Sequence, residues 1–316
     1  MPSLNWPTHH ALGTFATSEL PDGFSRLVGS VQPYDESVVT RHLSPDATPV
    51  KTGDDLIELY EHGERFWLVD DRWGLCEVNF RKSQWQSWVL DHPRLQGVQL
   101  AEAAVLWPLA QLMQHKSLTL IPAVSIARRG FGALIICPFG IEPELSALLS
   151  AGWRVIGQRW TALRDDDGRV AMLSMPGAVE RSAGSSRRLD ITERADGWID
   201  LLTEAPEARQ HHEFCDAVII VDAARRSAAR VRPINTAATA PSLRRAWPVF
   251  ELRSPQRATN MPARMAMECS VYDAQLSRRA EEFVMAMDRV SATRVPRPAP
   301  VQMQIMPERR QKQIPA

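Results

Sequence analysis

The feature that most constrains the fold is an apolar run, a short turn and a helical pattern within Gly132–Trp160. Ala133–Ile136 are four consecutive apolar residues, which is typical of a buried strand. A turn with Pro138 and Gly140 follows, then a pattern that predicts a helix over Glu142–Ala151 and a second strand after it. Nucleotide phosphates are bound at units of this order. The sequence therefore predicts an α/β fold.

The turn lacks the residues that hold phosphates. In a G-x-x-x-x-G-K-[ST] loop, glycines let backbone N–H groups reach the phosphates and a lysine adds positive charge. This turn has one glycine, no lysine and an acidic second half. The positions that remain of such a nucleotide loop are Cys137, Pro138, Phe139, Gly140, Ile141 and Glu142.

Two acidic residues open the predicted helix after this turn. Glu142 and Glu144 would repel a phosphate, so one interpretation is a reshaped pocket for a different ligand. The interpretation that we favour is ordinary helix stabilisation, because carboxylates suit the positive end of the helix dipole. Pro143 near the first helical position agrees with it.

Further segments extend the pattern on both sides of the turn. They are an apolar helix, a Leu-rich link and a strand over Leu100–Arg129, the step Ala151–Ile156, the turn Asp167–Val170, the apolar strand Ala217–Val221 and the basic stretch Arg225–Pro233. With these segments, residues 55–255 resemble divergent members of the HPr kinase/phosphorylase-related family of bacterial P-loop serine kinases. The resemblance implies a P-loop-kinase-like mixed sheet flanked by helices.

The resemblance also implies a loss of activity. Active relatives place an Asp-Asp pair after the second strand to help hold magnesium, and the matching positions here are Gln158 and Arg159. Phosphoryl transfer depends on positioning and charge stabilisation. Loss of the lysine, the loop glycines and the acidic pair together indicates a pseudokinase. We therefore expect no cofactor and no metal, and a binding, regulatory or scaffold role for a protein or peptide partner.

Two alternatives remain open. The first is an active ATP-dependent serine kinase whose cation is relocated to Arg128 or Arg129 and whose acidic residue is relocated to Asp165 or Asp166. The second is a structural component of a larger assembly, in which the ten tryptophans and a Pro-rich tail make the contacts.

Two groups of residues are candidates for partner binding. Trp85 and Trp88 share one side of a helix if Ser83–Leu90 is helical, and an exposed pair would indicate an interface, since Trp is enriched in binding hot spots. The second group can bind phosphate or carboxylate bidentately, although a solvated surface is the alternative. It consists of Arg225, Arg226, Arg244 and Arg245.

No motif predicts a metal site. His211 and His212 are adjacent, and neighbouring side chains of a strand point to opposite faces. The run Asp165–Gly168 lacks the remainder of a calcium loop and is typical of a β-turn.

Composition indicates a globular protein. The 316 residues carry a formal net charge of zero, which gives no general attraction to nucleic acid or membrane. The four cysteines are far apart, and no apolar stretch reaches the length of a membrane span or matches a signal peptide. We expect a cytoplasmic protein.

The chain divides into four expected parts. They are an irregular N-terminal segment (1–52), the α/β domain (53–255), a C-terminal helical segment (256–291) and a disordered Pro-rich tail (292–316). Within them we expect a small β-rich N-terminal region with a hairpin over Arg65–Phe80, a helix over Leu95–His115 that Pro108 kinks or restarts, a mobile loop at Ser182–Arg188, and a helix over Ser270–Val290.

Overall fold

The computed structural model of the protein describes most of the chain between residues 14 and 293. The described ranges are 14–17, 27–35, 37–50, 57–70, 74–90, 102–115, 117–137, 140–166, 168–175, 179–180, 198–199, 205–222, 225–246 and 260–293. The expected mobile loop Ser182–Arg188 and the tail beyond residue 293 lie outside these ranges, as do the loop positions Pro138 and Phe139.

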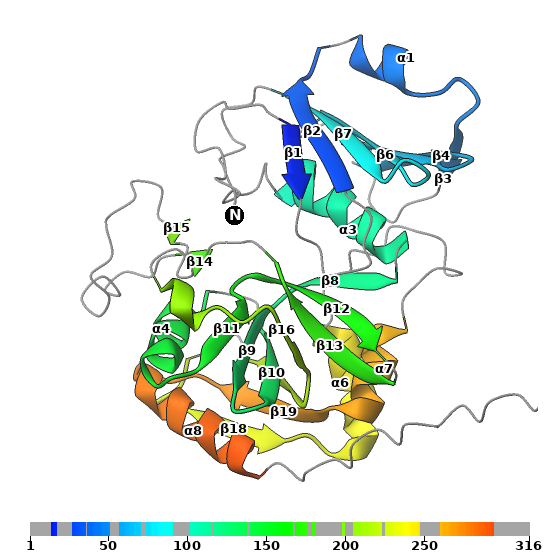
Figure 1. Ribbon diagram of the computed structural model, residues 1–316. Coiled ribbons are helices and arrows are strands. Elements are labelled where there is room, and N and C mark those ends of the chain that lie inside the picture. The colour runs from blue at the N-terminus through cyan, green and yellow to red at the C-terminus, as the bar shows by residue number, and fades with distance from the viewer. Residues whose placement is uncertain are drawn as a thin grey trace, which may run out of the picture.

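The fold is mixed α/β, with several sheets and a C-terminal helix, as expected (Figure 1). A six-stranded sheet forms its centre, in the order β11-β9-β10-β17-β19-β18. Its strands are β9 (Val124–Arg128), β10 (Phe131–Ile136), β11 (Arg154–Gly157), β17 (Ala217–Val221), β18 (Arg230–Pro233) and β19 (Ser270–Gln275).

Helices cover both faces of this sheet. They are α4 (Glu142–Ser150) and α8 (Ala280–Ala292) on one face, and α6 (Thr236–Ala246) and α7 (Met261–Glu268) toward the other. Ala133 and Ile135 of β10 pack with α4 and α8, whereas Leu134 and Ile136 pack with α6 and α7. Successive side chains of a strand point to opposite faces, so an uninterrupted apolar run is what a strand buried on both faces requires.

A four-stranded antiparallel sheet packs against the face that carries α6 and α7. Its order is β16-β13-β12-β8, with β8 (Leu118–Pro122), β12 (Trp160–Asp166), β13 (Arg169–Ser174) and β16 (His212–Phe214). The expected turn between β12 and β13 is confirmed: Gly168 has a φ of +85° and its N–H donates to Asp165 Oδ1 at 3.1 Å. Two short strands, β14 (Val179–Glu180) and β15 (Trp198–Ile199), pair separately, and a 3-10 turn, η3, spans Pro206–Ala208.

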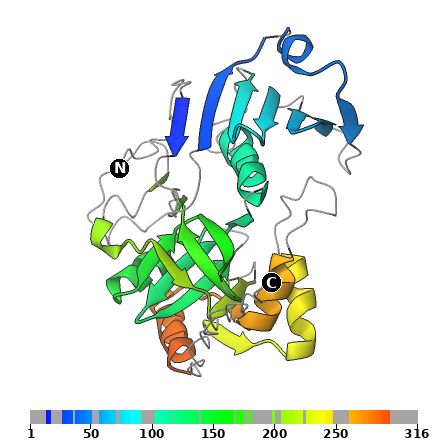
Figure 2. The same cartoon turned by 45° about the vertical axis from the view of Figure 1, so that its right-hand side comes forward.

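A seven-stranded sheet forms the N-terminal part of the molecule and stands at the opposite end from α8 (Figures 1 and 2). Its order is β1-β2-β7-β6-β5-β4-β3. The strands are β1 (Thr14–Thr17), β2 (Leu27–Pro33), β3 (Thr48–Val50), β4 (Ile57–His62), β5 (Arg65–Asp70), β6 (Gly74–Asn79) and β7 (Gln84–Val89), with α1 (Val38–His42) between β2 and β3. The expected hairpin is β5 paired with β6.

The helix α3 (Trp107–His115) joins the N-terminal sheet to the rest of the molecule. It follows a π-helical turn, η1 (Glu102–Leu106), so the helix restarts next to Pro108 as the sequence predicts. Its apolar side chains share one core with Phe66 of the seven-stranded sheet and with Trp160 of the four-stranded sheet. Among the described helices, none has the length and apolarity needed to cross a membrane.

The helix predicted over Ser270–Val290 is wrong in its first part. Residues 270–275 form β19, a strand between β17 and β18, and the helix α8 begins at Ala280. Val271 and Ala274 have the i, i+3 spacing of a helical stripe, but they lie on opposite faces of a strand that is buried on both sides.

Strand pairing crosses two of the expected boundaries between parts of the chain. β19 pairs with β17, so residues beyond 255 belong to the central sheet. β3 pairs with β4, so residues on either side of position 52 belong to one N-terminal sheet.

Substituting Ala274 with Asp tests the placement of β19. Ala274 is fully buried and Asp273 beside it is exposed. A buried, unpaired carboxylate should lower the free energy of unfolding by at least about 3 kcal/mol, whereas Asp273→Asn should change it by no more than about 0.5 kcal/mol. Urea unfolding measures both. Equal stability of the two variants would contradict the strand.

Candidate functional site

One edge of the central sheet collects the ends of four strands. β10 is parallel to β17, and β17 is parallel to β19. β11 is antiparallel to β9, which is itself antiparallel to β10, so β11 runs in the same direction as these three strands. Their carboxyl ends therefore lie at one edge, which is where open α/β sheets bind ligands.

The predicted strand, loop and helix lie at this edge. β10 ends at Ile136 and α4 begins at Glu142. Of the loop positions between them, Cys137 is half-buried, Gly140 is exposed and Ile141 is buried. The helix start thus faces the carboxyl ends of the strands, as in a phosphate-binding unit.

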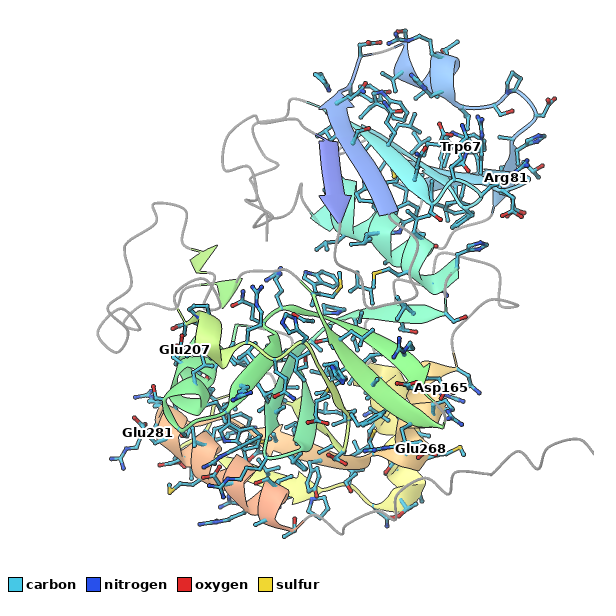
Figure 3. The ribbon with its side chains drawn as sticks, in the orientation of Figure 1. Trp67, Arg81, Asp165, Glu207, Glu268 and Glu281 are labelled. Carbon is cyan, nitrogen blue, oxygen red and sulfur yellow. The ribbon has the colours of Figure 1, made fainter. Side chains whose placement is uncertain are left out.

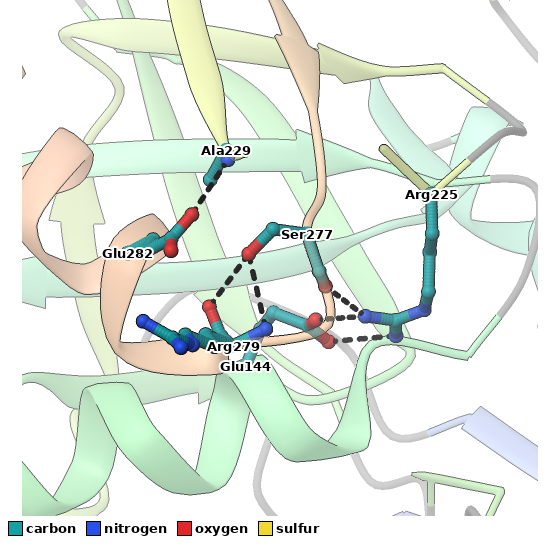
Figure 4. A network of polar contacts seen from close by, with 6 residues as sticks. All are labelled: Glu144, Arg225, Ala229, Ser277, Arg279 and Glu282. Carbon is teal, nitrogen blue, oxygen red and sulfur yellow. Dashed lines mark hydrogen bonds and ion pairs between the residues drawn. The ribbon is translucent and has the colours of Figure 1, made fainter. Parts of the chain in front are cut away.

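An ion pair between the buried Glu144 and the partly exposed Arg225 lies between α4 and the neighbouring strand ends. Glu144, in the first turn of α4, is 1% exposed. Arg225, which follows β17, binds it with both guanidinium ends: Nη1 contacts Oε1, and Nη2 donates to Oε2 at 3.1 Å (Figure 4). Nη1 also donates to the backbone oxygen of Ser277 at 2.9 Å. The hydrogen bonds that Arg225 donates to Glu144 raise the pKa of Arg225.

This ion pair changes the interpretation of the two acidic residues. Both carboxylates are in the first turn of α4, where the dipole favours them. Glu142 is buried and accepts a hydrogen bond from Ser146 Oγ at 3.0 Å. Glu144, however, is held by Arg225, and the residue before the helix, Ile141, makes no side-chain cap. Capping alone therefore does not account for Glu144.

Backbone hydrogen bonds fix the segments around the pair. After β17 and β19, the N–H of Asp222 donates to Ala274 O at 2.8 Å, and the N–H of Arg226 donates to Leu276 O at 2.7 Å. The carboxylate of Glu282 accepts the N–H of Ala229 at 2.9 Å, and this hydrogen bond lowers the pKa of Glu282 (Figure 4). Arg225 is thus attached to a segment with little freedom to move away.

The positions of the missing acidic pair lie at the same edge. Gln158 and Arg159 directly follow β11, which is separated from β10 by β9 alone. Two strand spacings place them about 10 Å from the line of β10. Gln158 is buried and Arg159 is half-buried. Gln158 and Arg159 therefore lie at the same edge of the sheet as the loop after β10, where the resemblance places the acidic pair. Neither of them is a carboxylate.

The sequence analysis missed one carboxylate at this edge. Asp222 directly follows the apolar strand β17, and in P-loop proteins an Asp near such a strand end holds magnesium. Its side chain is 40% exposed and lies 3.9 Å from Arg226. The sequence pattern that marks this carboxylate is four apolar residues followed by Asp, in Val218–Asp222.

The residues expected to replace the missing lysine and acidic pair lie away from the loop after β10. Arg128 pairs with Phe131, the first residue of β10, so about 16 Å of strand separates it from Ile136. Arg129 is in the adjoining turn. Asp165 is at the tip of the β12–β13 hairpin and pairs with Arg264 of α7 at 3.0 Å (Figure 3). Asp166, at the end of β12, pairs with Arg164 at 3.0 Å. The relocation to these four residues is wrong.

The condition for a partner-binding pair of Trp85 and Trp88, an exposed helix over Ser83–Leu90, is not met, and core packing, the alternative for these residues, is what the structure shows. Residues 84–89 form the strand β7, and both side chains are only 3% exposed. Trp85 packs in the core with α3, and Trp88 packs on the opposite face with Val38 of α1. An odd spacing of three places two residues of a strand on opposite faces. These residues stabilise the N-terminal sheet.

The candidate arginines separate into two groups. Arg225 is occupied by Glu144. Arg226, Arg244 and Arg245 are exposed, the last two in the final turn of α6. No group of three or more potential metal-binding side chains occurs within the part of the chain that the structure describes.

Comparisons with known proteins give matches among solved structures. No protein-family model matches the chain, and no curated protein matches it. Among solved structures, the chain is similar to the Hpr(Ser) kinase/phosphatase from Coxiella burnetii, with 12% sequence identity and a TM-score of 0.32. The match covers 55% of this chain and 97% of that chain.

Arg225→Ala should destabilise the protein strongly. It leaves the buried carboxylate of Glu144 without its cation, and because the Arg225 side chain is 34% exposed the cost should be about 2 kcal/mol, below that of a fully buried pair. Arg226→Ala is the matched control, because its 3.9 Å contact with Asp222 is exposed and worth at most about 1 kcal/mol. Urea unfolding gives both values. Adding Glu144→Gln to Arg225→Ala should recover part of the loss, and a failure to do so would contradict this account.

The four cysteines should differ in reactivity. Cys76, Cys215 and Cys269 are buried, and burial raises the pKa of Cys76 to about 12. At pH 8 a thiol with that pKa is only about one part in ten thousand thiolate, which is the reactive form. Half-buried Cys137 should therefore be labelled first by iodoacetamide in the native protein. Peptide mass spectrometry identifies the labelled site, and equal labelling of Cys76 would contradict the expectation.

Proposed function

We propose that the chain is a divergent HPr-kinase-like pseudokinase that acts as a binding or regulatory subunit for a protein or peptide partner. The observation that carries this proposal is the ion pair between buried Glu144 and partly exposed Arg225 at the carboxyl ends of β10, β17 and β19. The cation nearest the helix start is already neutralised by a carboxylate of this chain.

The pair opposes phosphate binding in two ways. A helix N-terminus binds phosphate because its N–H groups and dipole attract negative charge, and a carboxylate in the first turn weakens that attraction. Arg225 would have to leave Glu144 to reach a phosphate, which would leave a charge buried without a partner. Glu144 and a phosphate would therefore compete for Arg225. Glu144 belongs to the same chain as Arg225, so it is always present at this position.

The surface that supports partner binding is basic. Arg226, Arg244 and Arg245 are exposed near the carboxyl end of β17 and at the end of α6. Exposed guanidinium groups bind carboxylates and phosphates bidentately, so an acidic or phosphorylated partner fits them.

One observation favours the alternative of an active ATP-dependent kinase. Asp222 follows β17 at the edge where a P-loop protein holds its magnesium ion, and its contact with Arg226 is long and exposed. The kinase alternative therefore depends on Asp222 in this chain, and a single substitution separates the two functions.

ATP and magnesium should leave the thermal midpoint of the protein unchanged. A ligand raises the midpoint only if it binds the folded state, and among the described residues Arg225, which contacts the first turn of α4, is already paired with Glu144. Differential scanning fluorimetry of the wild type and of Asp222→Asn, with ADP and ATP, makes the measurement. A rise in the wild type that Asp222→Asn removes would contradict the pseudokinase and favour the kinase.

Reversing the charge at α6 should weaken partner binding. Once a partner is recovered by co-purification and prepared in pure form, Arg244→Glu/Arg245→Glu should raise its Kd by at least about tenfold. The control is Arg81→Glu/Lys82→Glu, an equal charge change at an exposed turn of the N-terminal sheet (Figure 3). Equal effects of the two double variants would contradict a role for this surface.

A further inference from the structure

A second basic site lies at the other end of β10. There the structure has a pocket of about 500 Å³. Its polar lining consists of Arg128, Arg129, Arg154 and Gln210, and the backbone of Gly130 and Gly152 completes it. The pocket is about 16 Å of strand away from the loop after β10, so it is separate from the site of the Glu144–Arg225 pair.

Backbone geometry fixes the rim of this pocket. Arg129 and Gly130 form the two-residue turn between β9 and β10, with φ angles of +52° and +73°. Positive φ at both positions is what a tight hairpin of this length requires, and an arginine is unfavourable there. The helix α4 ends at Ser150, and Gly152, two residues further on, has a φ of +82° and an N–H that donates to Leu149 O at 2.9 Å. The two turns hold the arginines close together.

One arginine of the pocket is fixed by neighbours. Arg128 Nη1 donates to Asp288 Oδ1 at 2.5 Å, and its guanidinium lies 5.7 Å from the centre of the Trp153 ring. Trp153 Nε1 donates to the same Asp288 oxygen at 3.1 Å. This cluster ties the pocket to α8 and orients one wall of it.

The other two arginines give the pocket its charge. Arg129 and Arg154 are exposed, and neither has a hydrogen-bond or ion-pair partner among the residues that the structure describes. Among the residues that the structure describes, no carboxylate lines the pocket. Two carboxylates contact its lining residues: Asp288 is bound by Arg128, and Glu213 accepts from Gln210 Nε2 at 3.2 Å and from the N–H of Phe214 at 3.0 Å. Two positive charges are therefore left without compensation.

We propose that this pocket binds a phosphomonoester. Two guanidinium groups match the two negative charges of such a group, and each can donate two parallel hydrogen bonds to its oxygens. A volume of about 500 Å³ is larger than a phosphate needs and lies within the range of ligand sites, so the pocket also accepts part of the molecule that bears the phosphate. That molecule is either a phosphorylated side chain of a peptide or a small phosphorylated metabolite.

Titration of the full-length protein tests the site. The probes are inorganic phosphate, a phosphoserine peptide with its unphosphorylated form, and a sugar phosphate, measured by isothermal calorimetry at low salt. At least one phosphomonoester should bind with a Kd below about 1 mM, and the binding should weaken as salt rises. The peptide and the sugar phosphate distinguish the two sources.

Three variants decide whether the pocket is responsible. Arg129→Gly and Arg154→Gln should each raise the Kd of the binding probe by about tenfold or more, whereas Arg81→Gln, at an exposed turn of the N-terminal sheet, should leave it unchanged. Arg129→Gly should also keep or raise the thermal midpoint, since glycine tolerates a φ of +52°. Loss of binding without loss of stability supports the site. No binding by any phosphomonoester, or equal binding by all variants, would overturn it.

Discussion

The buried carboxylate of Glu144 determines the charge and the contacts at the carboxyl ends of the central strands. A charge in that position requires a cation, and the chain supplies it from the segment after β17. Because Arg225 also donates to Ser277 O beyond β19, one guanidinium joins a helix start to two strand ends. The same group that stabilises the edge removes its positive charge from any incoming anion. Stability and ligand selectivity at this edge therefore depend on one interaction.

The central sheet has little freedom to change, because it is buried on both faces. β10 alternates its side chains between the α4–α8 core and the α6–α7 core. A rearrangement that opened the edge would have to disturb both cores, and the long apolar side chains in them are closely packed. The outer turn between β9 and β10 is not restricted in this way, and the three arginines of the second basic site are located around it.

Local patterns in the sequence predicted the local structure well. The apolar run of β10, the helix α4 and the hairpin of β5 and β6 were all identified, because each is determined by periodicity and turn residues within about ten positions. The two errors in secondary structure share a cause. In β7 and β19, side chains spaced three apart suggested a helix, but apolar side chains on both faces of these strands are buried, so the twofold alternation of a strand was hidden. The partner of Glu144 was also beyond sequence reasoning, since 81 positions separate it from Arg225.

The position of β19 has a consequence for how the protein forms during synthesis. β18 is made before β19, yet its partner in the sheet is β19. Until residue 275 has emerged from the ribosome, one hydrogen-bonding edge of β17 is therefore unpaired in the nascent chain, and β18 has no strand to pair with. The N-terminal sheet needs nothing from this late segment for its own strand pairing. The two ends of the protein are thus completed at different times on the ribosome, and a prematurely ended chain would carry a finished sheet joined to one that is prone to aggregate.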